Sequence, residues 1–214
     1  MYSVVIPTMW RSDRTISLLE AYDKCDAVNE ILLIDNDPSS APDYSHIEKL
    51  NVIHSGRNIY VNPSWNLGVA VSSCEDVIIS NDDISFPVEE TLNFMLESIY
   101  DCVGVHPKGI NNPEPVKMEL TEGNHIGNGW GVLMFVKKSK YKPIPSYLKV
   151  WFGDNWLHLT SKSVHSLTVN LHTEMSTTSN LSEMHPVIRM DINNWIAMTD
   201  MKNDRNAAAS LLMS

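Results

Sequence analysis

Short apolar runs alternate with segments of helical periodicity through the first half of this chain. The runs at residues 2–6, 30–34, 51–54 and 77–80 are rich in aliphatic residues and end at polar or acidic positions, which predicts four strands. Proline donates no ladder hydrogen bond, so Pro7 is expected to end the first strand. A further short strand is expected at residues 102–106.

Helical patterns lie between these runs. Ser12 or Asp13 is expected to cap a helix that reaches residue 24, and Asn62 another with Pro63 at its first position. A third helix begins at Pro87, and its apolar positions fall on one face: Val88, Leu92, Met95 and Ile99. Strand and helix units that alternate in this way predict an α/β fold with a mostly parallel, doubly wound sheet covered on both faces.

The second half of the chain is less regular. Residues 107–130 are rich in Asn, Gly, Pro and Glu, which predicts a long loop; this loop, or the tail after His172, is expected to act as a mobile lid. Strands are expected at 131–136 and 164–171, with a short helix starting near Asp154 between them. Helices are expected at 186–199 and 207–213.

Composition places the chain among ordinary globular proteins. It has 214 residues, a length sufficient to bury one substantial core, and 43% of them are apolar and 20% charged. No apolar run reaches the roughly 18 residues that span a bilayer, and no secretory leader is visible, so a cytoplasmic location is expected. The three cysteines, Cys25, Cys74 and Cys102, lack the spacing of a zinc site and are expected to be buried free thiols.

The net charge of the chain limits the classes of partner that it is expected to bind. A formal net charge of -10 disfavours a protein whose whole surface binds nucleic acid. Five lysines nevertheless cluster late in the chain: Lys137, Lys138, Lys140, Lys142 and Lys149. Such a cluster is either a solvated face or a contact surface for an anionic acceptor or a membrane.

The main chemical signal follows the strand at 77–80. Asn81 is followed by Asp82 and Asp83, which places two carboxylates at the carboxyl end of a buried strand. Ligands of open α/β sheets bind at that edge, and adjacent carboxylates repel each other unless a cation lies between them. The pattern therefore predicts a divalent metal site, with a solvated acidic turn as the alternative.

Together these segments resemble the metal-dependent GT-A glycosyltransferases, in particular the family-two-like enzymes that use nucleotide sugars. The resemblance covers most of the chain, from residue 3 to residue 179. In that family the first strand ends in a Pro-Thr pair beside the nucleotide, here Pro7 and Thr8. The second strand ends in an acid that binds uracil or ribose, here Asp35, and two Asn-containing segments correspond to Asn58 and Asn66.

The metal-binding motif of the family corresponds to residues 81–83. The resemblance implies that Asp82 contacts the ribose and that Asp83 binds Mn²⁺ or Mg²⁺. A late histidine followed by hydroxyl residues often completes the metal site in the family, and it corresponds to His172, Ser176 and Thr177.

Two segments of the chain correspond to the part of the family's enzymes that faces the acceptor. The glycine-rich one corresponds to Gly129, Trp130 and Gly131, and Trp130 and Trp151 are either core anchors or platforms for a sugar. The acid motif corresponds to residues 152–155. The resemblance implies that Asp154 is the general base of an inverting transfer.

The resemblance also implies a single GT-A-like domain. Its nucleotide-binding half would cover residues 1–106, its acceptor half 107–179, and a helical tail 180–214. The implied reaction moves a sugar from a nucleotide sugar, with a UDP-sugar expected, to an acceptor hydroxyl. The acceptor is expected to be a glycan, or else a hydroxylated base in phage DNA, since size and composition suit a bacterial or phage-encoded enzyme.

Two other classes of protein stay open at this point. Residues 34–39 also fit the D-x-D-x-S/T motif of haloacid-dehalogenase-like phosphatases, in which Asp35 would be the phosphoryl nucleophile. Because Asn81 stands where the family has an acid, an inactive module that binds a nucleotide sugar or a glycan is the other alternative. Release of UDP from a UDP-sugar separates the three classes.

Overall fold

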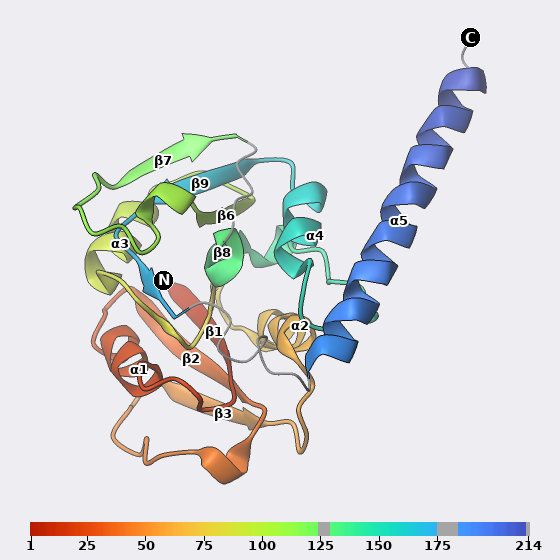
Figure 1. Cartoon of the computed structure of the whole chain (residues 1–214). Coiled ribbons are helices and arrows are strands. Elements are labelled where there is room, and N and C mark those ends of the chain that lie inside the picture. The colour runs from red at the N-terminus through yellow and green to blue at the C-terminus, as the bar shows by residue number, and fades with distance from the viewer. Residues whose placement is uncertain (124–128, 175–183, 213–214) are drawn as a thin grey trace.

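A mixed β-sheet runs through the centre of the protein (Figure 1). The structure, a computed structural model, describes residues 1–123, 129–174 and 184–212, with the backbone alone for 201–212. Within these residues eight strands form the sheet, in the order β3-β2-β1-β4-β8-β6-β9-β7. Their bounds are β1 Tyr2–Thr8, β2 Val28–Asp35, β3 Leu50–His54, β4 Asp76–Ser80, β6 Cys102–Val105, β7 Glu119–Glu122, β8 Leu133–Lys137 and β9 Val164–Thr168.

The strand directions bring the ends of several strands to one edge of the sheet. Strands β3, β2, β1 and β4 are parallel neighbours, and β8 pairs antiparallel with both β4 and β6. β9 runs parallel to β6, and β7 is antiparallel to β9. A separate ribbon pairs β5 (Ile84–Ser85) with β10 (His172–Thr173). The predicted α/β fold with a mostly parallel sheet is confirmed, and the carboxyl ends of β1, β2 and β4 meet at the same edge.

Helices cover both faces of the sheet. α1 and α3 pack on one face, where Leu19 and Leu92 join the core, whereas α2 and α4 pack on the other through Trp65 and Leu157. The carboxyl-terminal half of α5 extends beyond the rest of the molecule (Figure 1). The bounds are α1 Thr15–Asp23, α2 Val61–Val71, α3 Val88–Met95, α4 Gly153–Thr160 and α5 His185–Leu212, with 3₁₀ turns at η1 Pro38–Ser40, η2 Pro107–Gly109, η3 Trp130–Val132 and η4 Lys138–Lys140.

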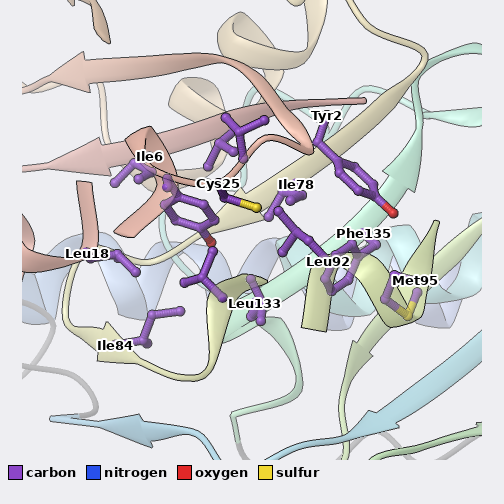
Figure 2. Packing of buried hydrophobic residues seen from close by; sticks show 14 of the residues in the cluster. Tyr2, Ile6, Leu18, Cys25, Ile78, Ile84, Leu92, Met95, Leu133 and Phe135 are labelled. Carbon is purple, nitrogen blue, oxygen red and sulfur yellow. The ribbon is translucent and has the colours of Figure 1, made fainter. Parts of the chain in front are cut away.

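Each face of the sheet has its own hydrophobic cluster. Successive side chains of β1 point to opposite faces, so Val4 and Ile6 join one cluster and Val5 the other. Figure 2 shows the first of these clusters, in which Tyr2 and Phe135 meet edge to face with ring centroids 6.0 Å apart. An unbroken apolar run is therefore the pattern of a central strand that is buried on both faces.

The first strand continues through Pro7 to Thr8, contrary to the prediction. Tyr2 N donates to Ala27 O (2.8 Å), so the backbone groups of the even-numbered residues in β1 face β2 and those of the odd-numbered residues face β4. Pairing with β4 ends at Val5. The missing amide hydrogen of Pro7 thus points to a side without a ladder partner, and the strand carries Thr8 to the carboxyl edge.

Two helices begin elsewhere than predicted. α1 starts at Thr15, because Ser12 Oγ accepts the Arg14 amide in the preceding turn (3.1 Å) instead of capping the helix. α2 already includes Asn62, whose buried side chain donates to Trp151 O (3.1 Å). Each polar side chain therefore bonds a backbone group other than the helix amides that it was expected to cap.

Several later boundaries also differ from the predictions. Ile99 lies beyond the end of α3 and is 89% exposed. The predicted loop at 107–130 contains β7 and part of η3, so the strand expected at 131–136 starts only at Leu133; residues 124–128 lie outside the described part. The strand expected at 164–171 ends at Thr168 as β9, and β10 begins only at His172. The continuous α5 replaces two predicted helices.

The cysteines follow the prediction with one exception. All three are free, and Cys25 and Cys102 are buried, but Cys74 is partly exposed. No helix in the described part of the chain is long and apolar enough to cross a membrane.

Candidate active site

The loops after β1, β2 and β4 meet at the carboxyl edge of the parallel strands. Thr8, at the end of β1, donates its hydroxyl to Asp82 Oδ2 in the loop after β4 (2.6 Å). The Trp10 amide donates to Thr8 Oγ1 (2.8 Å), and the Trp10 indole N–H donates to Asp35 Oδ1 at the end of β2 (3.1 Å). Three of the predicted site residues, Thr8, Asp35 and Asp82, are therefore linked into one group.

Asp35 is fully buried, yet only one of its carboxylate oxygens is satisfied. Oδ1 accepts the Trp10 indole N–H and the Asp37 amide (3.0 Å). Oδ2 has no hydrogen-bond partner among the described residues; His54 Nδ1 lies 3.3 Å away but outside hydrogen-bonding geometry. A buried acceptor without a donor is costly, so Oδ2 keeps an unused capacity to accept a hydrogen bond.

The pattern of the sequence did not single out Trp10. Its φ of +57° lies in the left-handed region, which bulky side chains rarely adopt, and its ring stacks on Tyr44 with centroids 5.6 Å apart. Backbone strain persists only where the surroundings hold it, and it is concentrated at ligand sites. The available signal was a tryptophan in a polar loop directly after a predicted strand.

Asp83 is a second acid with an unpartnered oxygen. Its side chain is buried, and Oδ1 has no hydrogen-bond partner within the described residues. Desolvation, assisted by repulsion from Glu174, raises the pKa of Asp83 above its usual range. A divalent cation would relieve both effects, so this carboxylate fits a metal ligand.

Asp82 shares this environment. It is half-buried, and desolvation raises the pKa of Asp82 to about 6, with the charge of Asp83 adding to the shift and the Thr8 hydroxyl opposing it. Two neighbouring carboxyl groups that resist ionisation together form a site that favours an added positive charge.

The ribbon of β5 and β10 brings the predicted histidine towards these acids. His172 pairs with Ser85, and Glu174 N donates to Asp83 O (3.3 Å). The His172 side chain is exposed, and among the described residues no three His, Cys, Asp or Glu side chains are arranged to hold a metal. Ser176 and Thr177 lie outside the described residues.

Asn58 and Asn66, the two asparagines that correspond to the family's Asn-containing segments, have different surroundings. Asn58 lies beside the loop after β1, with Nδ2 3.5 Å from Met9 Sδ. Asn66, on α2, accepts the Ile144 amide (2.9 Å) and the Tyr141 hydroxyl (2.8 Å), and its Nδ2 donates to Ile144 O (2.8 Å). The Asn66 side chain therefore holds the connection after η4, and both its amide nitrogen and its oxygen form hydrogen bonds there.

Asp154 lies in the first turn of α4, against the glycine-rich segment. A side chain at Gly131 would place its Cβ 2.7 Å from Asp154 Cβ and 2.9 Å from Oδ2, so only glycine leaves room for the carboxylate. Desolvation raises the pKa of Asp154, while the Asn155 amide (2.9 Å) opposes the shift. The structure thus brings Gly131 and Asp154 together and gives the carboxylate a raised proton affinity.

The tryptophans of this region divide into one core residue and one surface residue. Trp130 is fully buried and its indole N–H donates to Ser166 Oγ (3.2 Å), so it is a core anchor and not a sugar platform. Gly129, with a φ of +85°, directly precedes Trp130 and turns the chain into η3. Trp151 is 43% exposed and presents a ring to solvent just before α4.

Comparison of whole structures places this fold among glycosyltransferases. S. aureus TarS 1-349 matches with a TM-score of 0.59 and 17% identity, over 90% of this chain and 70% of that chain. TarS 1-349 in complex with UDP-GlcNAc matches with a TM-score of 0.57 and 16% identity, over 89% and 65%. GalNAc-T7 with UDP, GalNAc and Mn²⁺ matches with a TM-score of 0.57 and 12% identity, over 81% and 43%.

These likenesses define the class of fold. The chain has the GT-A fold of glycosyltransferases, as the resemblance implied. It spans 38% of the longer TarS chain that has also been solved. No protein-family model and no curated protein matches the sequence. The fold argues against the phosphatase alternative, whose motif follows the first strand, because Asp35 ends β2.

Proposed function

We propose that this chain is a metal-dependent glycosyltransferase that moves a sugar from a UDP-sugar to an acceptor hydroxyl with inversion. The observation that carries the proposal is the pair of buried carboxylate oxygens at the carboxyl edge that accept no hydrogen bond among the described residues, Asp35 Oδ2 and Asp83 Oδ1. The first needs a hydrogen-bond donor and the second a cation. A nucleotide sugar with its divalent metal supplies both.

In this proposal the nucleotide lies across the ends of β1 and β2. Asp35 accepts an N–H of the base or a hydroxyl of the ribose through Oδ2, beside the Trp10 ring. Asp82 faces the ribose and is oriented by the Thr8 hydroxyl. Pro7, next to Thr8 in β1, and Asn58, in the loop after β3 beside Met9, are the other residues proposed for this nucleotide site.

Asp83 is the proposed ligand of Mn²⁺ or Mg²⁺, and His172 is the second candidate. The bound metal would act as a Lewis acid that stabilises negative charge on the departing diphosphate. The chain contributes a carboxylate whose desolvation favours a cation next to it.

Asp154 is the proposed base on the acceptor side. It takes the proton of the acceptor hydroxyl while the oxygen forms a bond to the anomeric carbon and the bond from that carbon to the diphosphate breaks. Attack from the face opposite the leaving group inverts the anomeric centre. The exposed ring of Trp151 offers an apolar face to a glycan acceptor.

The lysine cluster favours a glycan over a DNA base as acceptor. Lys137 forms an ion pair with Asp76, and Lys138 Nζ donates to Ser72 O (2.5 Å). The first contact lies at the start of β4, the opposite end of that strand from residues 81–83, and the second at the end of α2. Two of the five lysines are thus occupied away from the proposed reaction centre.

The direct test of this function is release of UDP from a panel of UDP-sugars with Mn²⁺, with and without glycan acceptors. A transferase releases UDP faster when its acceptor is present and yields a glycosylated product. A phosphatase instead hydrolyses a phosphomonoester, and an inactive module binds the UDP-sugar, with a rise in melting temperature, but does not turn it over. Either of the last two results would refute the proposal.

Asp35→Ala is expected to weaken UDP binding by about tenfold to a hundredfold, since hydrogen bonds to a charged group contribute about 1.5–3 kcal/mol. Calorimetry measures this dissociation constant. The control is Asp37→Ala, whose carboxylate accepts the Ser39 and Ser40 hydroxyls within its own loop. Equal UDP affinity in the Asp35 variant and the wild type would reduce Asp35 to a turn residue.

A further inference from the structure

The backbone that leads into α4 is held from the side of α2. Asn62 N donates to Lys149 O (2.9 Å), and Asn62 Nδ2 donates to Trp151 O (3.1 Å). Gly153 packs on the same side chain, since a Cβ at this position would lie 2.1 Å from Asn62 Oδ1. The chain therefore passes close to α2 just before Asp154.

The opposite side of this backbone is held by one buried carboxylate on α5. Asp191 is fully buried and accepts three successive amides: Lys149 N to Oδ1 (2.8 Å), and Val150 N and Trp151 N to Oδ2 (2.7 and 2.9 Å). Successive N–H groups that converge on an anion form a nest, and hydrogen bonds to an ionised acceptor are stronger than neutral ones. Here the chain itself supplies the anion, from about 40 residues further along.

Two residues near Asp191 on α5 contact the same backbone segment before and after residues 149–151. Asn194 Nδ2 donates to Tyr147 O (2.9 Å), and the Trp195 ring stacks on Phe152 with centroids 5.0 Å apart and planes 7° apart. Phe152 has a φ of +65°, a left-handed conformation that a phenylalanine adopts only under constraint. The amino-terminal part of α5 thus clamps the backbone up to the residue that precedes α4.

We propose that Asp191 is a positioning residue for Asp154. By fixing the peptide groups of residues 149–151, it sets the direction in which the strained Phe152 turns the chain into α4, and so where the Asp154 carboxylate lies against Gly131. The amino-terminal part of α5 is then a component of the acceptor side. This inference rests on the proposed transfer reaction, in which Asp154 is the base.

Asp191→Asn tests this role, because it keeps the shape of the side chain but removes its charge and turns one acceptor into a donor that faces an amide. We expect kcat for acceptor-dependent transfer to fall by about tenfold to a hundredfold, the effect of a small misplacement of a catalytic group. The dissociation constant for UDP should not change. Hydrogen exchange at amides 149–151 should become faster.

The matched control is Asp200→Asn, the same change at an exposed position of the same helix, and it should behave as the wild type. Asp191→Glu retains the charge and should restore part of the transfer rate and of the amide protection. If Asp191→Asn does not fold, Trp195→Leu weakens the same clamp at Phe152 and should lower kcat without changing UDP affinity.

The outcomes separate this inference from the proposed function. Transfer at the wild-type rate by a folded Asp191→Asn variant whose amides exchange faster would overturn the positioning role. Unchanged exchange at amides 149–151 would overturn the clamp itself, whatever the activity. A wild-type protein that releases no UDP from any UDP-sugar would refute the proposed function, and faster exchange in the variant would then still establish the clamp.

Discussion

Asp154→Asn is expected to lower the rate of sugar transfer by about 10²–10⁴-fold, the usual contribution of a general base. The amide has nearly the shape of the carboxylate and fits beside Gly131, but it cannot take the proton of the acceptor hydroxyl. UDP affinity should stay unchanged, because the residues proposed for the nucleotide lie at the ends of β1 and β2. Steady-state rates with a saturating acceptor measure the loss.

The same variant should be at least as stable as the wild type at neutral pH. Desolvation raises the pKa of Asp154 in the folded state, so the folded protein holds this proton more tightly than the unfolded chain. Its contribution to the free energy of unfolding therefore falls as pH rises from about 3.9, the usual Asp pKa, through the raised value, and is constant above it. Asparagine carries no charge, so it removes the cost of burying the ionised Asp154 carboxylate.

Urea unfolding of both proteins across that pH range measures the difference. Asp26→Asn, at an exposed position, is the control and should show neither the loss of transfer nor the change in pH dependence. Transfer at the wild-type rate by Asp154→Asn, or a product with retained anomeric configuration, would exclude Asp154 as the base of an inverting reaction. A strongly lowered melting temperature would indicate a structural role instead.

Asp83→Asn is expected to abolish metal-dependent turnover while the protein remains folded. A neutral amide contributes far less to a hard cation such as Mn²⁺ or Mg²⁺ than a carboxylate does. Among the described residues no group of three or more His, Cys, Asp or Glu is placed to hold a metal ion in its stead. Mn²⁺ titration in the presence of UDP measures the loss of affinity separately from activity. Removal of the metal from the wild type by a chelator should give the same loss of turnover, restored by added Mn²⁺.

Glu174→Gln provides the comparison for this second prediction. Glu174 repels Asp83 but is exposed, so its neutralisation should change Mn²⁺ affinity less than the Asp83 substitution does. Full turnover by Asp83→Asn, or full turnover by the wild type in chelator, would remove the metal from the proposed mechanism. The fold assignment would be unaffected by either result.

Much of the fold was predictable because its central strands are buried on both faces. Residues 2–6 and 77–80 are uniformly apolar or small, a pattern that is typical of strands in a parallel sheet covered on both faces. The boundaries were less predictable, because they depend on partners. Pro7 stays within β1 only because β4 has already ended on that side.

The acids of the site were predictable for a related reason. Parallel strands deliver their carboxyl ends to one edge, so Asp35, Asp82 and Asp83 had to come near one another once the strands were in place. Other residues gave no such signal, because the side chains that explain them are far away in the chain. Trp130 looks like a loop residue until Ser166 and the core surround it.

The sequence by itself determined the α/β class, the order of the central elements and the acids at the strand ends, since these follow from local periodicity and from strand direction. Only the tertiary structure decided which side chains serve the fold and which remain free. Asn66 bonds Ile144, and Asp191 bonds the amides before α4, from 78 and about 40 residues away. The physical reason is that a polar group's role depends on whether its hydrogen bonds are satisfied, which distant parts of the chain decide.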